Sequence, residues 1–209
     1  MCGLYGRYVF PWLMDWLLRG EKFAEQRKKV LADAAGVVVE IGFGTGLNLA
    51  HYGPHVVRLL AVEPVAMLPG KVRQRISASS IPVERIEAPA ESLPLTSGSC
   101  DCAVTTWTLC SVRDVAGSLV ELKRVLRPGG KLIFLEHGLS DDPAVAKWQG
   151  RLTPVQRVLG CGCHLDRPIG RFIEHSGLAV ERMNRFVLDN ESPIVATMYA
   201  GVARKTEGR

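Results

Sequence analysis

The chain lacks several features that mark whole classes of protein. Its 209 residues contain no internal repeat, no low-complexity tract and no Pro- or Ser-rich linker, so we expect a single domain over residues 1–209. The net charge of +5 comes from scattered basic residues, and no dense basic stripe interleaved with aromatics is present, which argues against a nucleic-acid partner. The tightest basic run, 71–75, predicts one solvated helix face.

The cysteines show neither a disulfide framework nor a metal-binding spacing. Six are present, and no two of them form a CxxC pair (Cys2, Cys100, Cys102, Cys110, Cys161 and Cys163). A reduced, cytoplasmic chain is the simplest interpretation. Cys161, Cys163 and His164 form a CxCH cluster, but no second CxxC or HxxxH completes the four ligands of a zinc site. We therefore expect no metal.

Long apolar runs are also missing. The stretch 9–18 is broken by Asp15 and bounded by Arg7 and Arg19, so it is too short and too polar to span a bilayer. No small-residue cleavage site follows it closely, and we expect no signal peptide. With 47% hydrophobic residues, the chain can still bury a sizeable core without disulfides or metals.

Short apolar runs alternate with helical patterns along most of the chain. Runs typical of buried strands lie at 37–41, 58–62, 83–86, 101–105 and 131–136. Apolar residues at helical spacing over 119–126 end at a turn, 127–130, that leads into the fifth run. Two further β-prone runs, 179–188 and 194–203, are separated by a polar loop and predict a hairpin. The pattern favours an α/β fold: a doubly wound, mostly parallel seven-stranded sheet with an antiparallel C-terminal hairpin over 178–204.

A glycine-rich turn directly follows the first predicted strand. Gly42, Gly44 and Gly46 follow one another at spacing two, and Glu40 lies two residues before the first of them. Glycines let the backbone turn sharply and approach a ligand closely. The dinucleotide fingerprint GxGxxG has its third glycine one residue further on, and a pyrophosphate favours helix amides without a nearby carboxylate. A cationic ligand with a sulfonium and an ammonium group tolerates the acidic residue.

Glu63 ends the second predicted strand, seventeen residues after Gly46. A carboxylate at this place accepts hydrogen bonds from ribose hydroxyls in nucleotide-binding sheets. The same geometry serves NAD and S-adenosylmethionine alike, so Glu63 by itself does not separate the two. With a strand before the glycine turn and a helix expected after it, the motif predicts a nucleoside-containing ligand at this end of the sheet.

Four strings resemble, in order and spacing, the motif series of class I S-adenosylmethionine-dependent methyltransferases (methyltransferase type 11). They lie within residues 36–137 and read EIGFGTG, AVEP, AESLPLTSGSCD and LKRVLRPGGKLIFLEH. Within that superfamily the chain is similar to the methyltransferase-like alkyl-thiol methyltransferases through LCSV (109–112), Glu136-His137 and CHLDR (163–167). Bacterial phosphatidylethanolamine N-methyltransferases and quinone C-methyltransferases share the core motifs but are less similar at these strings.

The resemblance implies which residues hold the cofactor, S-adenosylmethionine. Ten residues are expected there: Glu40, Gly42, Gly44, Gly46, Asn48, Glu63, Ala90, Glu91, Thr106 and Trp107. The glycines would face its methionine part, Glu63 the ribose, Ala90 and Glu91 the adenine, and the last two residues the sulfonium. One departure is visible, because Pro89 stands where the family often has Asp or Asn. Glu91 or a backbone carbonyl would then have to contact the adenine amino group.

His137 is the candidate catalytic residue. It ends the fifth predicted strand, at the edge where open α/β sheets bind ligands. Its imidazole could accept a proton from a thiol or ammonium acceptor. The alternative is a histidine hydrogen-bonded to the loop backbone. Because a sulfonium is already a good leaving group, positioning and exclusion of water could suffice without a base.

We expect a methyltransferase that acts on a heteroatom, with a thiol favoured, of a small hydrophobic acceptor. A phospholipid amine of the phosphatidylethanolamine type is the alternative acceptor, and a non-catalytic S-adenosylmethionine-binding module is a further alternative. Residues 138–170 would cover the substrate, and residues 1–30 would form a lid, a helix packed on the core or a membrane-surface helix. The charge of a membrane-surface helix would come from Arg7, Arg19, Lys22, Arg27, Lys28 and Lys29. The protein would then be cytoplasmic with peripheral membrane contact.

Overall fold

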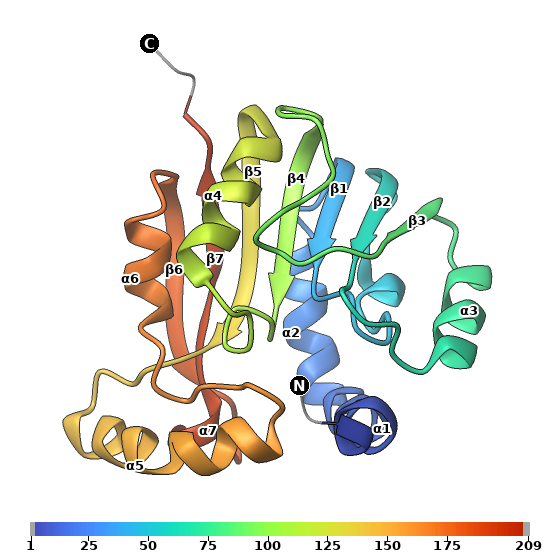
Figure 1. The fold of residues 1–209 in the computed structure, drawn as a ribbon. Coiled ribbons are helices and arrows are strands. Elements are labelled where there is room, and N and C mark those ends of the chain that lie inside the picture. The colour runs from blue at the N-terminus through green and yellow to red at the C-terminus, as the bar shows by residue number, and fades with distance from the viewer. Residues whose placement is uncertain (1–2, 207–209) are drawn as a thin grey trace.

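One seven-stranded sheet runs through the chain, in the order β3-β2-β1-β4-β5-β7-β6 (Figure 1). The computed structural model describes residues 3–206, so Cys2 lies outside the described residues. The strands are β1 (Gly36–Ile41), β2 (Val56–Val62), β3 (Val83–Ile86), β4 (Cys100–Thr106), β5 (Leu126–His137), β6 (Ala179–Val187) and β7 (Thr197–Arg204). The strands from β1 to β5 pair in parallel, whereas β7 is antiparallel to both β5 and β6. The predicted doubly wound, mostly parallel α/β sheet with an antiparallel C-terminal hairpin is confirmed.

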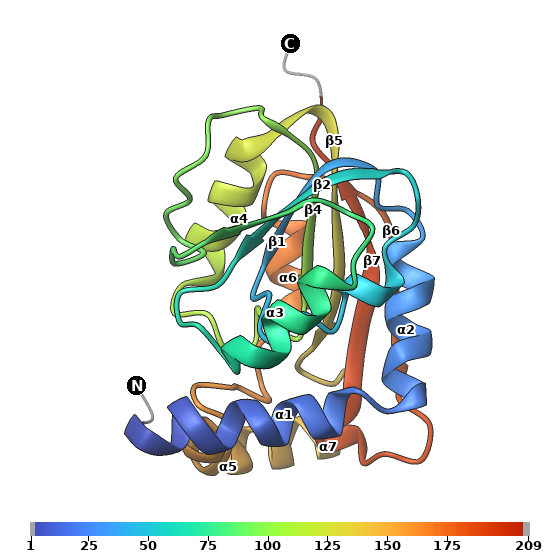
Figure 2. The ribbon, with the colours of Figure 1, turned by 90° about the vertical axis from the view of Figure 1, so that its right-hand side faces the viewer.

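Alternating apolar side chains on the inner strands explain why helices cover both faces of the sheet. The helices are α1 (Phe10–Leu18), α2 (Glu21–Leu31), α3 (Pro69–Ser77), α4 (Val115–Val125), α5 (Pro143–Leu159), α6 (Ile169–Glu174) and α7 (Pro193–Ala196). In β1, Val39 and Ile41 belong to the core cluster that includes residues of α4 and α6, and Val38 belongs to the cluster that includes residues of α2 and α3. Successive strand residues point to opposite faces, so such a strand is buried on both sides. Figure 2 shows α4 and α6 on one side of the sheet and α2 on the other.

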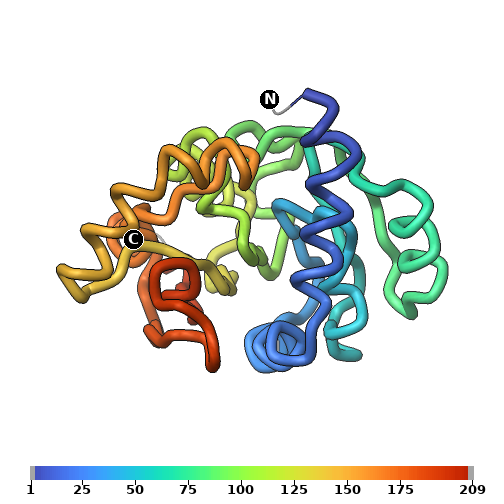
Figure 3. The backbone as a smooth tube through the Cα atoms, turned by 90° about the horizontal axis from the view of Figure 1, so that it is seen from below, coloured from blue at the N-terminus to red at the C-terminus, as the bar shows by residue number. Residues whose placement is uncertain are grey.

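The strands β1, β2, β4 and β5 all end at one edge of the sheet, which we call the carboxyl edge. The helices α1, α5 and α7 lie there, below the strand ends (Figure 1). Seen from below, α1 and α5 lie on opposite sides of this edge (Figure 3). No helix within residues 3–206 is both long and apolar enough to cross a membrane. Open α/β sheets bind ligands outside the carboxyl ends of their strands, so both helices lie beside the expected site.

The helix expected after the glycine turn is absent from residues 47–55. The chain forms only one 3-10 turn there, η2 (Leu49–His51), and Tyr52 is already extended. Gly53 and Pro54 follow at once, and a proline disfavours helical backbone in the residue before it. The glycine turn is therefore held by side chains of other segments and not by a following helix.

Two strands also begin at other residues than the sequence predicts. In the pairing of β4 with β5, Leu126 lies opposite Cys100 and Lys131 lies opposite Cys102. The residues 127–130 of β5 therefore face a single residue of β4, so the expected turn is a bulge inside β5. The run 194–203 becomes strand only at Thr197, so this part of the hairpin prediction is wrong. Pro193 instead begins the short helix α7, and the side chain of Ser192 caps its first turn.

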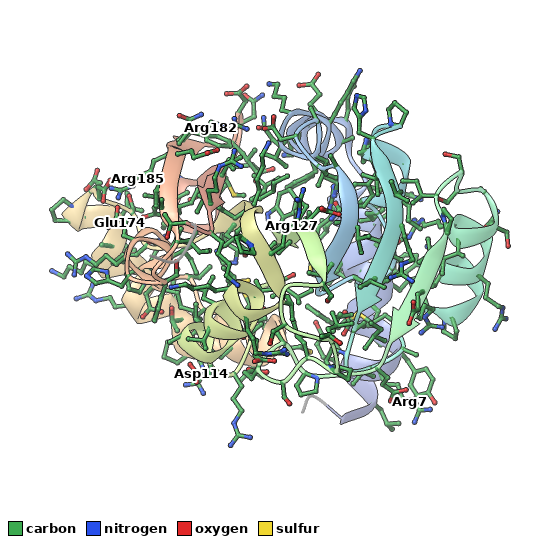
Figure 4. The ribbon with its side chains drawn as sticks, turned by 90° about the horizontal axis from the view of Figure 1, so that it is seen from above. Arg7, Asp114, Arg127, Glu174, Arg182 and Arg185 are labelled. Atoms are coloured by element: carbon green, nitrogen blue, oxygen red, sulfur yellow. The ribbon has the colours of Figure 1, made fainter. Side chains whose placement is uncertain are left out.

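Charged side chains line β6, the outer strand at one edge of the sheet (Figure 4). Arg182 pairs with Asp33, and Nη1 of Arg185 lies 2.6 Å from Oδ2 of Asp141. The other guanidinium nitrogen of Arg185 lies 3.9 Å from Oε1 of Glu174. Exposed ion pairs of this kind add little stability each, but charge on an edge strand discourages pairing with another chain.

Gly201 in β7 has no room for a side chain. A Cβ there would overlap the carbonyl oxygen of Arg182 and lie 2.7 Å from Cζ of Phe134. We expect Gly201→Ala to lower the free energy of unfolding by about 1–3 kcal/mol, the usual cost of overpacking, as measured by urea denaturation. Gly150→Ala in α5 is the matched control, because a Cβ there meets nothing within 4 Å, and it should leave stability unchanged or raise it. Equal stability of the two variants would contradict the close approach of β6 and β7.

Candidate active site

The glycine turn lies at the carboxyl edge, directly after β1. Gly42, Gly44 and Gly46 have φ angles of +69°, +56° and +81°. A Cβ on Gly42 would overlap Oγ1 of Thr108, so this glycine lets the loop after β4 pack against the turn. A Cβ on Gly44 would meet nothing nearer than a backbone oxygen at 3.8 Å. The turn therefore presents the backbone of Gly44 to open space, where a ligand can approach it.

Glu63 lies next to this turn, at the end of β2. Its Oε2 accepts a hydrogen bond from N of Gly44 at 2.9 Å. Burial raises the pKa of Glu63, against the opposing effect of the backbone amides of Gly44 and Val65. An ionised carboxylate can accept several hydrogen bonds, so Glu63 can hold the turn and still receive hydroxyls of a ligand.

Glu40, Asn48 and Thr106 come together in a buried network. Nδ2 of Asn48 donates to Oε1 of Glu40 at 2.9 Å and to Oγ1 of Thr106 at 3.0 Å. Oδ1 of Asn48 in turn accepts from Nε of Arg27 at 3.0 Å, and the hydroxyl of Tyr52 donates to Oε2 of Glu40 at 2.6 Å. These side chains tie the glycine turn to β1, β4 and α2. The structure thus brings together three of the predicted cofactor residues and adds Arg27 and Tyr52, which the sequence did not reveal.

Arg27 is directed inward and not toward solvent. It is 3% exposed, so the prediction that it supplies surface charge for a membrane-surface helix is wrong. Lys22, counted in the same prediction, forms an ion pair with Glu191.

Burial raises the pKa of Glu40 to about 7, although the hydrogen bonds of Tyr52 and Asn48 and the charge of Arg27 oppose this. The buried guanidinium thus partly compensates a buried carboxyl group.

Trp107, directly after β4, has a backbone conformation that L residues rarely adopt, with φ at +49°. Its indole ring centroid lies 4.7 Å from the guanidinium of Arg27 and 5.6 Å from the ring of Phe23. Its amide donates to O of Leu135 at 2.9 Å. Residues held in strained backbone of this kind cluster at functional sites.

The two residues expected at the adenine lie in the loop after β3. Ala90 is buried in the core cluster that includes α4. Oε1 of Glu91 accepts a hydrogen bond from N of Asp114 at 2.9 Å, just before α4. Pro89, which directly precedes Ala90, is exposed. The role of Ala90 and Glu91 at the adenine stays a prediction.

His137 ends β5 and is 7% exposed. Its Nε2 lies 3.1 Å from Sγ of Cys163. The preceding residue, Glu136, is fully buried and accepts hydrogen bonds from the amides of Thr108 and Leu109. Glu136 therefore holds the loop after β4 against the end of β5. That His137 acts as a base stays a prediction, and its Nε2 faces a thiol of the chain itself.

Asp15 lies over the glycine turn from α1. It is 1% exposed, and its carboxylate accepts hydrogen bonds from Thr45 at 2.7 Å, Lys71 at 2.6 Å and Arg75 at 2.5 Å. Burial tends to raise the pKa of Asp15, but these hydrogen bonds outweigh it and hold the pKa well below its usual range. The prediction that 71–75 forms a solvated face is wrong for Lys71 and Arg75, which reach Asp15, whereas Arg73 is exposed. The signal available in the sequence was an acidic residue inside an apolar helix.

Surface hollows of about 330 and 240 Å³ lie away from the carboxyl edge. The first lies between α2 and the β6–β7 hairpin. The second surrounds Asp101 and Arg127, at the end of the sheet opposite the carboxyl edge. Neither contains a residue expected at the cofactor. The glycine turn is covered instead by α1, through the contacts of Asp15.

Known proteins share both the sequence and the fold of this chain. A family profile described as a methyltransferase domain matches residues 39–134. The thiol S-methyltransferase TMT1B of Homo sapiens is 33% identical over 190 residues, which cover 84% of this chain and 78% of that protein. The YcgJ protein of Bacillus subtilis has a similar fold, with a TM-score of 0.69 and 14% identity over 88% of this chain and 99% of that chain.

A second solved structure was determined with a cofactor product in place. It is the 1,6-didemethyltoxoflavin-N1-methyltransferase of Burkholderia thailandensis with bound S-adenosylhomocysteine, with a TM-score of 0.68 and 16% identity over 95% of this chain and 84% of that chain. The glycine turn, the carboxylate after β2 and the strand order agree with these similarities. The cofactor is S-adenosylmethionine, and the chain belongs to the class I S-adenosylmethionine-dependent methyltransferases, in the family of the thiol S-methyltransferases TMT1A and TMT1B.

Proposed function

We propose that this methyltransferase transfers the methyl group of S-adenosylmethionine to the sulfur of a small, apolar thiol. The observation that carries the proposal is the similarity to the thiol S-methyltransferase TMT1B, which spans 190 residues and so extends well beyond the methyltransferase profile at 39–134. Specificity for a substrate resides mainly in the loops and added segments around a shared core. Similarity outside the core therefore supports a similar acceptor.

The residues at the carboxyl edge fit the cofactor. Gly44 leaves room for a ligand, since the nearest atom to a Cβ there would be 3.8 Å away. The backbone of the glycine turn would face the methionine part, and Glu63 would accept the ribose hydroxyls. Glu40, whose pKa burial raises to about 7, would be more readily ionised beside the positive charges of the ligand. When bound, S-adenosylmethionine supplies a methyl group on a positively charged sulfur, which leaves as a neutral thioether.

Positioning and the exclusion of water are the chain's own contributions to the reaction. Trp107, held between Arg27 and Phe23, would line the sulfonium side together with Thr106. We propose residues 1–30 as a lid, because Asp15 attaches α1 to the glycine turn. Residues 138–170, which contain α5, would cover the acceptor. A dry, rigid site of this kind favours in-line attack by the acceptor sulfur.

Substitutions at the glycine turn and at Glu63 test this placement of the cofactor. Gly44→Asp would fill the space left for the ligand and force an L residue into a φ of +56°, so we expect no measurable binding of S-adenosylhomocysteine. Glu63→Ala should weaken binding by about 1–3 kcal/mol through the loss of a charged acceptor. Calorimetric titration measures both, with circular dichroism to check the fold. Gly53→Asp, where a Cβ meets nothing within 4 Å, is the matched control and should bind as the parent does. Unchanged affinity in both test variants would falsify the placement.

A methyl-transfer assay with labelled cofactor tests the acceptor. The panel contains small alkyl and aryl thiols, amines, phenols and phosphatidylethanolamine vesicles. We expect kcat/KM for apolar thiols to exceed that for the matching amines and phenols by at least about tenfold, the scale on which a shaped pocket discriminates. Methylation of membrane-held amines without methylation of thiols would overturn the proposal in favour of the phospholipid alternative. Cofactor binding with no transfer to any acceptor would indicate a non-catalytic module.

We further propose that α1 and α5 together contact an anionic membrane surface that holds an apolar acceptor. Trp12 and Trp16 on α1 are 55% and 52% exposed, and Trp148 on α5 is 51% exposed. The hydroxyl of Tyr5, in the π-helical turn Tyr5–Val9 that directly precedes α1, donates to O of Leu159, the last residue of α5, at 2.9 Å. This hydrogen bond links the N-terminal segment to α5. Exposed cations accompany these side chains: Arg7, Arg19, Lys147, Arg151 and Arg157. Both helices lie below the strand ends (Figure 1), and exposed apolar and basic side chains in this region suit an interfacial position on anionic lipids.

Sedimentation with anionic vesicles tests the membrane proposal. We expect the parent chain to bind and its binding to fall with added salt, and Trp16→Glu/Trp148→Glu to reduce binding by at least about tenfold. Val57→Glu/Val120→Glu is the matched control, because both valines are exposed and lie outside α1 and α5. It adds the same charge and should bind nearly as the parent does. Absence of binding by the parent chain, or an equal loss in both double variants, would contradict the proposal.

A further inference from the structure

Two thiols and one imidazole meet at the carboxyl edge. The Sγ atoms of Cys110 and Cys163 and a ring nitrogen of His137 all lie within 4.8 Å of one another. Nε2 of His137 lies 3.1 Å from Sγ of Cys163, and all three residues are buried. We call them the thiol–imidazole cluster. Cys163 follows His137 by 26 residues, a separation that resembles no zinc-binding spacing. The sequence predicts no metal for another reason, because Cys161, Cys163 and His164 have no second CxxC or HxxxH to complete a zinc site.

Hydrogen bonds hold the three segments of the cluster in place. Glu136 accepts two backbone amides of the loop after β4, which fixes Cys110 next to His137 at the end of β5. The amide of His164 donates to O of Cys110 at 2.9 Å, which ties the segment that carries Cys163 to the same loop. The three donor atoms are therefore held close together by backbone segments that hydrogen bonds already fix, as a metal site requires.

The cluster lies near the cofactor side of the edge. Thr108 packs directly on Gly42, since a Cβ on that glycine would lie 2.8 Å from Cβ of Thr108. Cys110 follows Thr108 by two residues on the same loop. The thiol–imidazole cluster and the glycine turn are thus two neighbouring parts of the carboxyl edge.

The donor set matches the chemistry of zinc. Thiolates and imidazoles are its preferred ligands, and three protein ligands with one open position characterise catalytic zinc sites. Tetrahedral zinc, with bonds of about 2.1 Å to nitrogen and 2.3 Å to sulfur, holds its donors roughly 3.6–3.8 Å apart. Donors within 4.8 Å of one another reach this spacing with small side-chain movements.

The charge at the site also suits an added thiolate. Zinc with two thiolates and a neutral imidazole carries no net charge. Nη1 of Arg167 donates a hydrogen bond to O of Leu109 at 2.5 Å, so the guanidinium lies beside the loop that carries Cys110. Its positive charge can therefore compensate a third thiolate, one that comes from the acceptor.

We propose that Cys110, His137 and Cys163 bind a zinc ion whose fourth position takes the acceptor sulfur as a thiolate, an inference that rests on the proposed thiol methylation. As the zinc–sulfur bond forms, the S–H proton passes to solvent. In the transfer, a lone pair of the acceptor sulfur forms the new sulfur–carbon bond, and the electron pair of the broken carbon–sulfonium bond stays on the departing sulfur. The thioether product carries no charge, binds zinc weakly and is released. His137 then serves as a ligand, and the ion takes over the task expected of a base.

The zinc content of the full chain is the first test. The protein is expressed with added zinc, purified under reducing conditions without chelators and measured by inductively coupled plasma mass spectrometry. We expect about one zinc per chain, and at least about a tenfold loss in Cys110→Ser and in Cys163→Ser. Cys161→Ser is the matched control, because it lies in the same loop outside the cluster, and it should retain the ion.

Cobalt(II) in place of zinc gives a readout that is independent of activity. We expect the intense visible absorption of a tetrahedral ion with sulfur ligands, and we expect a small apolar thiol, added without S-adenosylmethionine, to shift it. An unchanged spectrum would overturn the open position. Less than about a tenth of an equivalent of zinc in the parent chain, or a Cys110–Cys163 disulfide in its place, would overturn the site even if thiols are methylated. A spectral shift without any thiol methylation would support the site and count against the proposed function.

Discussion

A fully buried carboxylate, Glu136, fixes the loop after β4 against the end of β5, and the arrangement of the carboxyl edge around His137 depends on this contact. Glu136 accepts a hydrogen bond from the hydroxyl of Thr105 and two more from backbone amides of the loop after β4. A carboxylate at this depth is costly unless donors surround it, so the loop has to fold around the end of β5. The loop that Glu136 holds in place includes Trp107, with its positive φ, and Cys110, which meets His137.

Two further buried carboxylates organise the surroundings of the glycine turn in the same way. Glu40 joins β1 to the glycine turn and to α2 through Asn48 and Arg27. Asp15 joins α1 to the glycine turn and to α3. Each contact links segments that are far apart in the chain, and any of these groups would be costly to leave unpaired while it stays buried. Buried polar groups thus hold the carboxyl edge in one arrangement, whereas apolar packing holds the sheet below it.

The attachment of α1 differs in kind from the packing of the other long helices. Of its nine residues only Pro11 and Asp15 are buried, whereas α4 buries five residues against the sheet. If α1 opened, water would replace a few ion pairs and hydrogen bonds, and little apolar surface would be exposed. The free energy of such a local opening is low. This suits the lid that we propose for residues 1–30, which would have to open and close while the sheet stays intact.

The sequence by itself determined the sheet, the glycine turn and the family, because the signals for these are local. Apolar runs of five or so residues mark buried strands, glycines at spacing two mark a turn with positive φ, and Glu63 follows at a set distance along the chain. Only the tertiary structure decided that Arg27 is buried against Asn48. It also decided that Lys71 and Arg75 reach the buried carboxylate of Asp15. The same holds for Cys110, His137 and Cys163, whose meeting depends on the order of β4 and β5 in the sheet and on the loops beyond their ends. Contacts of this kind join residues from separate segments, and no spacing along the chain records them.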